Sequence, residues 1–171
     1  IAPSIQTHIV EDFLTESTLV EILGEPEAPA RFDVVVDAID SFKNKCLLID
    51  GCRARNTPVV VVGGAGGRVD PTRVRLDDIS RSEGDRLLSM LRKRLRQKHR
   101  FPRSGKWGIP CVYSPEPQRF PDGAGGVCAS KPEGTDTMRL DCHSGFGAAS
   151  FVTGTFGFFA AKAAVDLLLR K

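Results

Sequence analysis

The sequence predicts an α/β fold, a mainly parallel sheet with helices on both faces. Two runs rich in β-branched residues, 32–39 and 58–62, are apolar almost without alternation, which is typical of strands covered on both faces. Between them Phe42, Cys46 and Ile49 recur at helical spacing. Strand, helix and strand with short connections form a right-handed crossover, the unit of an open parallel sheet. The 171 residues suffice for one such domain with a sizeable core.

The remaining elements of the first third are expected to be short. Residues 5–10 predict a strand, and residues 15–23 predict a helix that Gly24 can end as a C-terminal cap. The helix between the two apolar strands should begin after Ser41, a natural N-cap residue. It should run until Asn56, because the Asn-Thr-Pro sequence that starts there cannot continue a helix.

A glycine-rich segment, 63–67, follows the second strand. Asp70-Pro71 comes next, where a dinucleotide-binding loop would open a helix, and without that helix N-terminus nothing offers free amides to a pyrophosphate. A turn of close approach that lines a pocket is therefore favoured over a nucleotide-binding loop. A further strand is expected at 73–76.

The next helix is expected to carry most of the positive charge. Ser82 and Asp85 resemble a capping box at its start, and its apolar stripe is Leu87, Leu91 and Leu95. Residues 86–100 hold seven of the 24 Lys and Arg residues and no acid. Such a helix can bind RNA phosphates, although a solvated face is the commoner role. The candidate nucleic-acid-binding residues are Arg92, Lys93, Arg94, Arg96, Lys98 and Arg100.

The last third combines a loop-rich stretch and an apolar one. Residues 101–140 are rich in Pro and Gly, with one apolar piece at 111–114, and 121–139 predicts a long functional loop. Residues 145–169 are apolar, but two charges interrupt them, which favours a buried closing helix over a membrane span. The expected domain thus has three parts, 1–100, 101–140 and 141–171.

Five cysteines without a C-x-x-C pair argue against a zinc ribbon and against a secreted disulfide framework. We therefore expect a reduced, cytoplasmic location. The N-terminus shows no basic stretch followed by an apolar run, so no targeting peptide is expected. Ile1 is not an initiator methionine, which suggests a boundary within a longer protein.

Two positions are candidates for chemistry. Asp40 follows the 32–39 strand at its carboxyl end, where open sheets bind ligands, and its carboxylate suits Mg²⁺ on a nucleotide; alternatively, it caps the next helix. Cys142 precedes the last helix, and a helix N-terminus lowers the pKa of a nearby thiol; alternatively, it is a small buried core residue. The sequence alone leaves both alternatives open.

Five motifs, taken in order, resemble the tRNA threonylcarbamoyladenosine dehydratase family, a branch of the ubiquitin-activating-enzyme-like superfamily. The resemblance covers nearly the whole chain. The motifs are Asp37-Ala38-Ile39-Asp40-Ser41 with Lys45, Gly63 to Gly67 with Asp70-Pro71-Thr72, Cys111-Val112-Tyr113-Ser114 with Glu116, Asp141-Cys142, and Ser144 to Ala149.

The resemblance implies a Rossmann-like fold and an enzyme that uses ATP and Mg²⁺ to adenylate the threonyl carboxylate of the modified adenosine, then cyclises it with loss of water. Asp40 matches the residue that binds the metal and ATP, and Cys142 the proposed catalytic cysteine. The expected cofactor-binding residues are Ala38, Ile39, Asp40, Ser41 and Lys45.

The resemblance also implies partners: tRNA, a second copy in a homodimer, and a sulfur-transfer protein. The family's Gly-rich ATP loop lies before the point where Ile1 aligns, so we expect the C-terminal portion of such an enzyme. Two alternatives are an adenylating activator of a ubiquitin-like sulfur carrier and a non-catalytic module that binds tRNA. The absence of paired C-x-x-C motifs favours the dehydratase.

Overall fold

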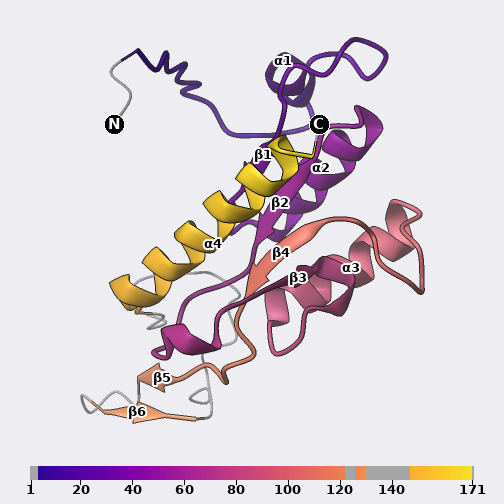
Figure 1. Ribbon diagram of the computed structural model, residues 1–171. Coiled ribbons are helices and arrows are strands. Elements are labelled where there is room, and N and C mark those ends of the chain that lie inside the picture. Colours follow the sequence, from indigo (N-terminus) through magenta and orange to yellow (C-terminus); the bar gives the residue numbers. More distant parts are fainter. Residues whose placement is uncertain (1–3, 122–125, 130–146, 171) are drawn as a thin grey trace.

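The computed structural model describes residues 4–121, 126–129 and 147–170. Within these ranges the central sheet has the strand order β1-β2-β4-β3 (Figure 1). Its strands are β1 (Val35–Asp37), β2 (Val59–Val62), β3 (Arg75–Asp78) and β4 (Pro110–Tyr113). The first two and β4 run parallel, whereas β3 runs antiparallel to β4.

Helices cover both faces of this sheet, as the sequence predicts (Figure 1). One face packs against α1 (Leu19–Leu23), α2 (Phe42–Ala54) and α3 (Arg86–Lys98), and the other against α4 (Ser150–Leu168). Single 3-10 turns, η1 (Pro71–Arg73) and η2 (Ile79–Arg81), flank β3. A separate two-stranded ladder joins β5 (Phe120–Pro121) to β6 (Val127–Cys128).

The predicted crossover from β1 through α2 to β2 is confirmed. In β2, consecutive residues Val60 and Val61 are both fully buried, so both faces of this strand are covered. The first strand is shorter than predicted and lies at the edge of the sheet. Its Val36 is 45% exposed, because no element among the described residues covers that position.

The strand predicted for residues 5–10 is wrong. These residues pair with no strand in the described chain, and Ile5 and Ile9 are 66% and 77% exposed. The helix predicted for 15–23 is confined to its second half. The residues before it form a turn that two hydrogen bonds of the Thr18 hydroxyl stabilise. Thr18 Oγ1 accepts a hydrogen bond from the Thr15 amide at 2.9 Å and donates one to the Phe13 carbonyl at 2.7 Å.

The N-cap of α3 is Asp85, not Ser82. The Asp85 carboxylate accepts a hydrogen bond from the Leu88 amide at 2.9 Å, whereas the Ser82 hydroxyl donates to the Ile79 carbonyl and closes η2. Leu88, rather than the predicted Leu87, is fully buried alongside Leu91 and Leu95. The helix thus starts later than a capping box at Ser82 would place it.

The last helix is only half-buried, which corrects the prediction of a buried closing helix. Its inner stripe packs on the sheet, while no described element covers its outer face, and Phe158 is 79% exposed. The buried stripe is Val152, Phe156, Ala160 and Ala163. By length and composition α4 is also the one helix in the described ranges that could span a membrane, which is weak support for a span because core helices pass the same test.

The loop after α3 is fixed to the end of β3 by Asp78. Its buried carboxylate accepts hydrogen bonds from the amides of Ser80 (2.9 Å), Trp107 (3.0 Å), Gly108 (2.6 Å) and Ile109 (3.2 Å). Burial by itself would raise the pKa of Asp78, but these hydrogen bonds to the charged form outweigh it, so the pKa is lowered.

This arrangement predicts a pH-dependent stability. A lowered pKa in the folded state means that Asp78 stabilises the fold above its unfolded pKa, and that this contribution is lost as the pH falls through the folded value. The difference in unfolding free energy between the natural protein and Asp78→Asn should therefore be largest near neutral pH and shrink below about pH 4. Urea titrations from pH 7 to pH 3 measure it, and a difference independent of pH would contradict it.

Candidate functional site

A buried ion pair supports the turn at the carboxyl end of β1. Lys45 Nζ lies 2.8 Å from Asp37 Oδ2, and both side chains are fully buried. The other carboxylate oxygen of Asp37 accepts from the Ile39 amide at 3.1 Å. Burial raises the pKa of Asp37, and the charge of Lys45 opposes this rise. The pair fixes the position at which the backbone leaves the sheet and enters α2.

Asp40 projects from this turn as an exposed side chain. The N-cap of α2 is Ser41, so the alternative in which Asp40 caps this helix does not hold. Within the described part of the chain, the Asp40 carboxylate has no ion-pair or hydrogen-bond partner. Ala38 is also exposed, and Ile39 is half-buried. A carboxylate in this state is available to an external cation.

Lys45 differs from its neighbours in the motif. It was expected to bind the cofactor, but its side chain is fully buried and bonded to Asp37. In this structure Lys45 therefore stabilises the turn after β1 through its ion pair with Asp37. Direct contact between Lys45 and a nucleotide stays a prediction.

The glycine segment 63–67 packs closely against its neighbours. A Cβ added at Gly63 would lie 2.6 Å from Asp85 Oδ2, and one at Gly67, whose φ is +71°, would lie 2.7 Å from the Arg119 carbonyl oxygen. No α-helix follows the segment, only the three-residue η1. The interpretation as a close-approach turn rather than a nucleotide-binding loop is therefore supported by the geometry.

Arg68 joins three loops below this segment. Its side chain is 1% exposed and donates to the Glu116 carbonyl at 3.3 Å and to the Gly84 carbonyl at 3.2 Å, and Nη2 lies 3.6 Å from Asp85 Oδ2. Burial lowers the pKa of the guanidinium, and Asp85 and Glu116 oppose that shift. Nη1 is buried without a hydrogen-bond partner in the described residues.

Two carboxylates complete this network. Asp85 accepts from the Gly64 amide at 2.9 Å through the oxygen that faces Arg68. Glu116 accepts from the amides of Val69 (3.1 Å) and Asp70 (3.0 Å). The loops after β2 and β4 and the start of α3 are thus held together by charge-assisted hydrogen bonds.

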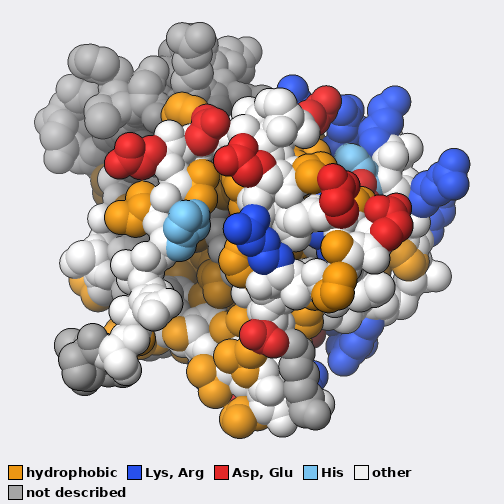
Figure 2. Space-filling view, turned by 90° about the horizontal axis from the view of Figure 1, so that it is seen from above, with side chains coloured by type: hydrophobic (Ala, Val, Ile, Leu, Met, Phe, Trp, Pro, Cys, Tyr) orange, Lys and Arg blue, Asp and Glu red, His pale blue; other side chains and the backbone are white. Residues whose placement is uncertain are grey.

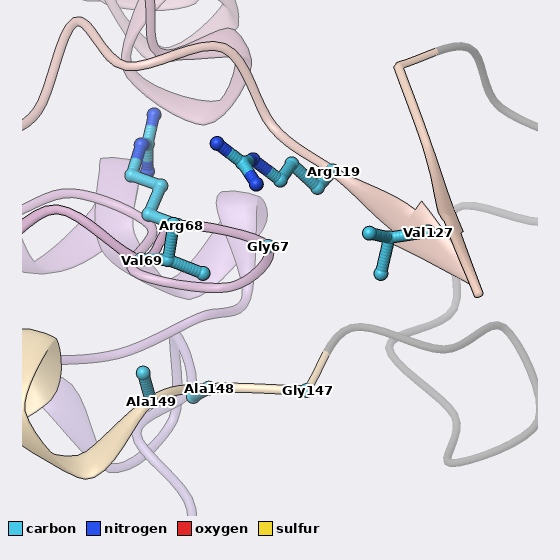
Figure 3. Close-up of a pocket in the computed structure, with 8 residues that line it drawn as sticks. All are labelled: Gly67, Arg68, Val69, Arg119, Val127, Gly147, Ala148 and Ala149. Carbon is cyan, nitrogen blue, oxygen red and sulfur yellow. The ribbon is translucent and has the colours of Figure 1, made fainter. Parts of the chain in front are cut away.

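A cavity of about 400 Å³ lies beside Gly67 (Figure 3). The Gly67 amide donates a hydrogen bond to the Gly147 carbonyl at 3.0 Å, and the Gly67 carbonyl accepts one from the Arg119 amide at 2.8 Å. Gly67 thus connects the side of the cavity that contains Arg119 with the side that contains Gly147. Figure 3 shows Arg68 and Arg119 on one side and Ala148 and Ala149 on the other. The lining residues are Gly67, Arg68, Val69, Arg119, Val127, Gly147, Ala148 and Ala149.

Cys142, the predicted catalytic cysteine, lies outside the described residues. Three other cysteines, Cys46, Cys52 and Cys111, are buried in the core. Burial raises the pKa of Cys46 to about 11 and of Cys52 to about 12, and it also raises that of Cys111. At neutral pH these thiols are not ionised. No group of three or more His, Cys, Asp or Glu side chains in ranges 4–121, 126–129 and 147–170 is arranged to hold a metal ion.

The predicted RNA-binding residues divide into two groups. Lys93, Arg94, Lys98 and Arg100 are exposed. Arg92 and Arg96 are half-buried and have partners within the chain: Arg92 bonds the Ser82 hydroxyl, and Arg96 lies over the Trp107 ring at 5.3 Å. Figure 2 shows Lys and Arg side chains along the right-hand edge, the side on which Figure 1 places α3.

The role of the ion pair beneath the turn can be measured by stability. Lys45→Met should lower the unfolding free energy by about 3–5 kcal/mol, because it leaves the Asp37 carboxylate buried without its partner. Lys43→Met, at an exposed position of the same helix, should change it by less than about 0.5 kcal/mol. Equal effects of the two substitutions in urea denaturation would show that Lys45 is not buried in solution.

We compared the sequence with protein families and with proteins of known function. No protein-family model matches the sequence. The whole chain aligns with the tRNA threonylcarbamoyladenosine dehydratases of Escherichia coli strain K12, at 38% identity, and of Haemophilus influenzae strain KW20, at 35% identity. The chain spans 63% and 62% of the length of these two relatives.

Solved structures agree with this alignment. A structure described as TcdA (CsdL) matches 94% of this chain and 58% of its own, with a TM-score of 0.77 and 36% identity. The E. coli dehydratase in complex with ATP matches 94% of this chain and 56% of its own, with a TM-score of 0.73 and 32% identity. The Rossmann-like fold and the family resemblance found in the sequence are confirmed, and this chain is a relative of the tRNA threonylcarbamoyladenosine dehydratases.

Proposed function

We propose that the protein acts in the ATP-dependent dehydration of threonylcarbamoyladenosine in tRNA. The observation that carries this proposal is Asp40, exposed and without a partner in the described chain, at the carboxyl end of a parallel strand. Relatives that align with the whole chain are named for this reaction, and the E. coli dehydratase was solved in complex with ATP and, separately, with AMP. A carboxylate becomes a good electrophile once adenylation turns its oxygen into a leaving group, and ring closure then releases AMP.

The residues around Asp40 fit a nucleotide-bound Mg²⁺. This cation is usually held by one or two carboxylates together with phosphates and waters, so a single free carboxylate is a suitable protein ligand. When bound, the metal would neutralise phosphate charge. Ala38, Ile39 and Ser41 share the turn with Asp40 and are the expected nucleotide contacts. The pair Asp37–Lys45 holds this turn against the sheet.

Cys142 is the proposed second catalytic residue. It precedes Gly147 by five residues, and Gly147 is hydrogen-bonded to Gly67 at the cavity wall. The support for this role is the match of Asp141-Cys142 to the family motif, since Cys142 itself lies outside the described residues. We assign Cys142 to the step after adenylation, in which the activated threonyl group is cyclised and AMP leaves.

Substitutions of Asp40 and Cys142 should affect different steps, adenylation and cyclisation respectively. In the protein expressed from its full-length gene, Asp40→Asn should abolish ATP–pyrophosphate exchange, because it removes the charge that holds the metal. Cys142→Ala should retain ATP binding by calorimetry and lose cyclised tRNA product, measured by mass spectrometry of nucleosides. Normal exchange in Asp40→Asn, or normal product in Cys142→Ala, would remove that residue from the mechanism.

The exposed basic residues of α3 are proposed to bind the tRNA backbone. Each phosphate that a Lys or Arg neutralises releases counterions, so binding should weaken as salt rises. The remaining expectations, a sulfur-transfer protein partner and a cytoplasmic location, stay predictions.

A homodimer is proposed on the outer face of α4. Phe151, Phe158 and Val165 are spaced by seven residues on one face of the helix, and they are 57%, 79% and 51% exposed. Apolar residues at this spacing are typical of helix packing against a second helix. Light scattering should give twice the mass of one polypeptide, and Phe158→Asp should give the single mass. A dimer that persists in Phe158→Asp would rule out this face.

A further inference from the structure

We propose that the loop after α3, residues 100–107, belongs to the same RNA-binding face as the helix, and that Arg103 and Lys106 contact the phosphate backbone. This inference rests on the proposed function, since it takes an RNA as the partner. The inference adds Arg103 and Lys106 to the basic residues of α3, and it follows from the way in which the loop folds against that helix.

The loop extends the positive charge without adding any negative charge. Residues 86–109 contain nine Lys and Arg residues and no Asp or Glu. Arg103 and Lys106 are both exposed, and neither side chain has an ion-pair or hydrogen-bond partner in the described part of the chain. Arg103 and Lys106 are therefore available to an external anion.

Contacts on the helix side fold the loop back onto α3. The Phe101 amide donates to the Leu95 carbonyl at 3.2 Å, and the Pro102 carbonyl accepts from Trp107 Nε1 at 3.0 Å. The Phe101 and Trp107 rings lie 4.8 Å apart between centroids. Residues 101–107 are thereby closed into a compact turn, in which Arg103 and Lys106 lie between the two aromatic anchors.

Cationic side chains stack on both anchors. Arg96 of α3 lies 5.3 Å from the Trp107 ring centroid, and Arg53 of α2 lies 4.0 Å from that of Phe101. Arg53 also pairs with Asp50 at 2.8 Å, and the His99 ring bonds the same carboxylate at 2.8 Å. The Asp50 carboxylate is thus already engaged by Arg53 and His99.

Asp78 holds the other end of the loop through the amides of residues 107–109. A loop anchored at both ends presents its charges at fixed positions, so little conformational entropy is lost when a ligand binds. This is the property that distinguishes Arg103 and Lys106 from lysines on a flexible tail. A polyanion of regular charge spacing is the complementary partner, and the backbone of a folded RNA has that spacing.

The occupant is an RNA backbone rather than exposed bases. Trp107 is half-buried, and its ring and Phe101 are engaged with each other and with the two arginines. They are therefore not free as platforms on which bases could stack. Recognition at this loop should depend on charge and shape, with little dependence on sequence.

The test is the affinity of an unmodified tRNA transcript measured by fluorescence anisotropy at several salt concentrations, with the protein expressed from its full-length gene. The double substitution Arg103→Gln with Lys106→Gln should lower the salt-dependence slope by roughly 1.4 to 1.8, and lower the affinity in 0.1 M salt roughly 30-fold. The matched control, Arg31→Gln with Arg73→Gln, removes two exposed charges that belong neither to α3 nor to the loop after it, and should leave the slope unchanged.

A second variant separates this inference from the proposed function. Lys93→Gln, Arg94→Gln and Lys98→Gln together test the helix alone. If this variant loses affinity while the loop variant binds as the natural protein does, the loop inference is wrong and the proposed function stands. If neither variant changes the slope, RNA does not bind this face at all. Weaker binding by the loop variant at an unchanged slope would also overturn the inference.

Discussion

The carboxylate of Asp85 joins the loop after β2 to the start of the basic helix α3. One of its oxygens caps α3 at Leu88, and the other accepts from Gly64 and faces Arg68. Buried charges are costly unless they are paired and hydrogen-bonded, and here the Asp85 carboxylate both accepts from two amides and faces the Arg68 guanidinium. Because Arg68 also reaches the loop after β4, the network sets the position of α3 relative to the carboxyl ends of the strands. The helix proposed to bind RNA is thereby held at a fixed position relative to the sheet.

The two faces of the sheet are covered unequally. Three helices pack on one face and α4 alone on the other, so α4 buries a narrow stripe and leaves an apolar outer face. The loop-rich segment between β4 and α4 converges on Gly67, where Arg119 and Gly147 meet from opposite directions. The cavity at that meeting point is lined by Gly67, Arg119 and Gly147 themselves.

The local pattern of apolar residues correctly predicts those helices and strands that pack against the core along their whole length. Continuous apolar residues predicted β2, and helical spacing predicted α2, because each sees the same core along its length. The segment 5–10 has the composition of a strand, but composition does not say whether a neighbouring strand exists. Likewise the charge of Lys45 gives no sign that it lies buried against Asp37, eight residues earlier. Arg68 was missed for the same reason, since only the fold brings Gly84, Asp85 and Glu116 around it.

The core cysteines have a practical consequence for spectroscopy. Cys46, Cys52 and Cys111 are shielded from thiol-directed reagents at neutral pH, both by burial and by their raised pKa values. Of the four cysteines that the structure describes, only Cys128 is then left for labelling, and it is half-buried. With Cys142 replaced by Ser, a dye or spin label at Cys128 would therefore report on the β5–β6 ladder without removal of any core thiol.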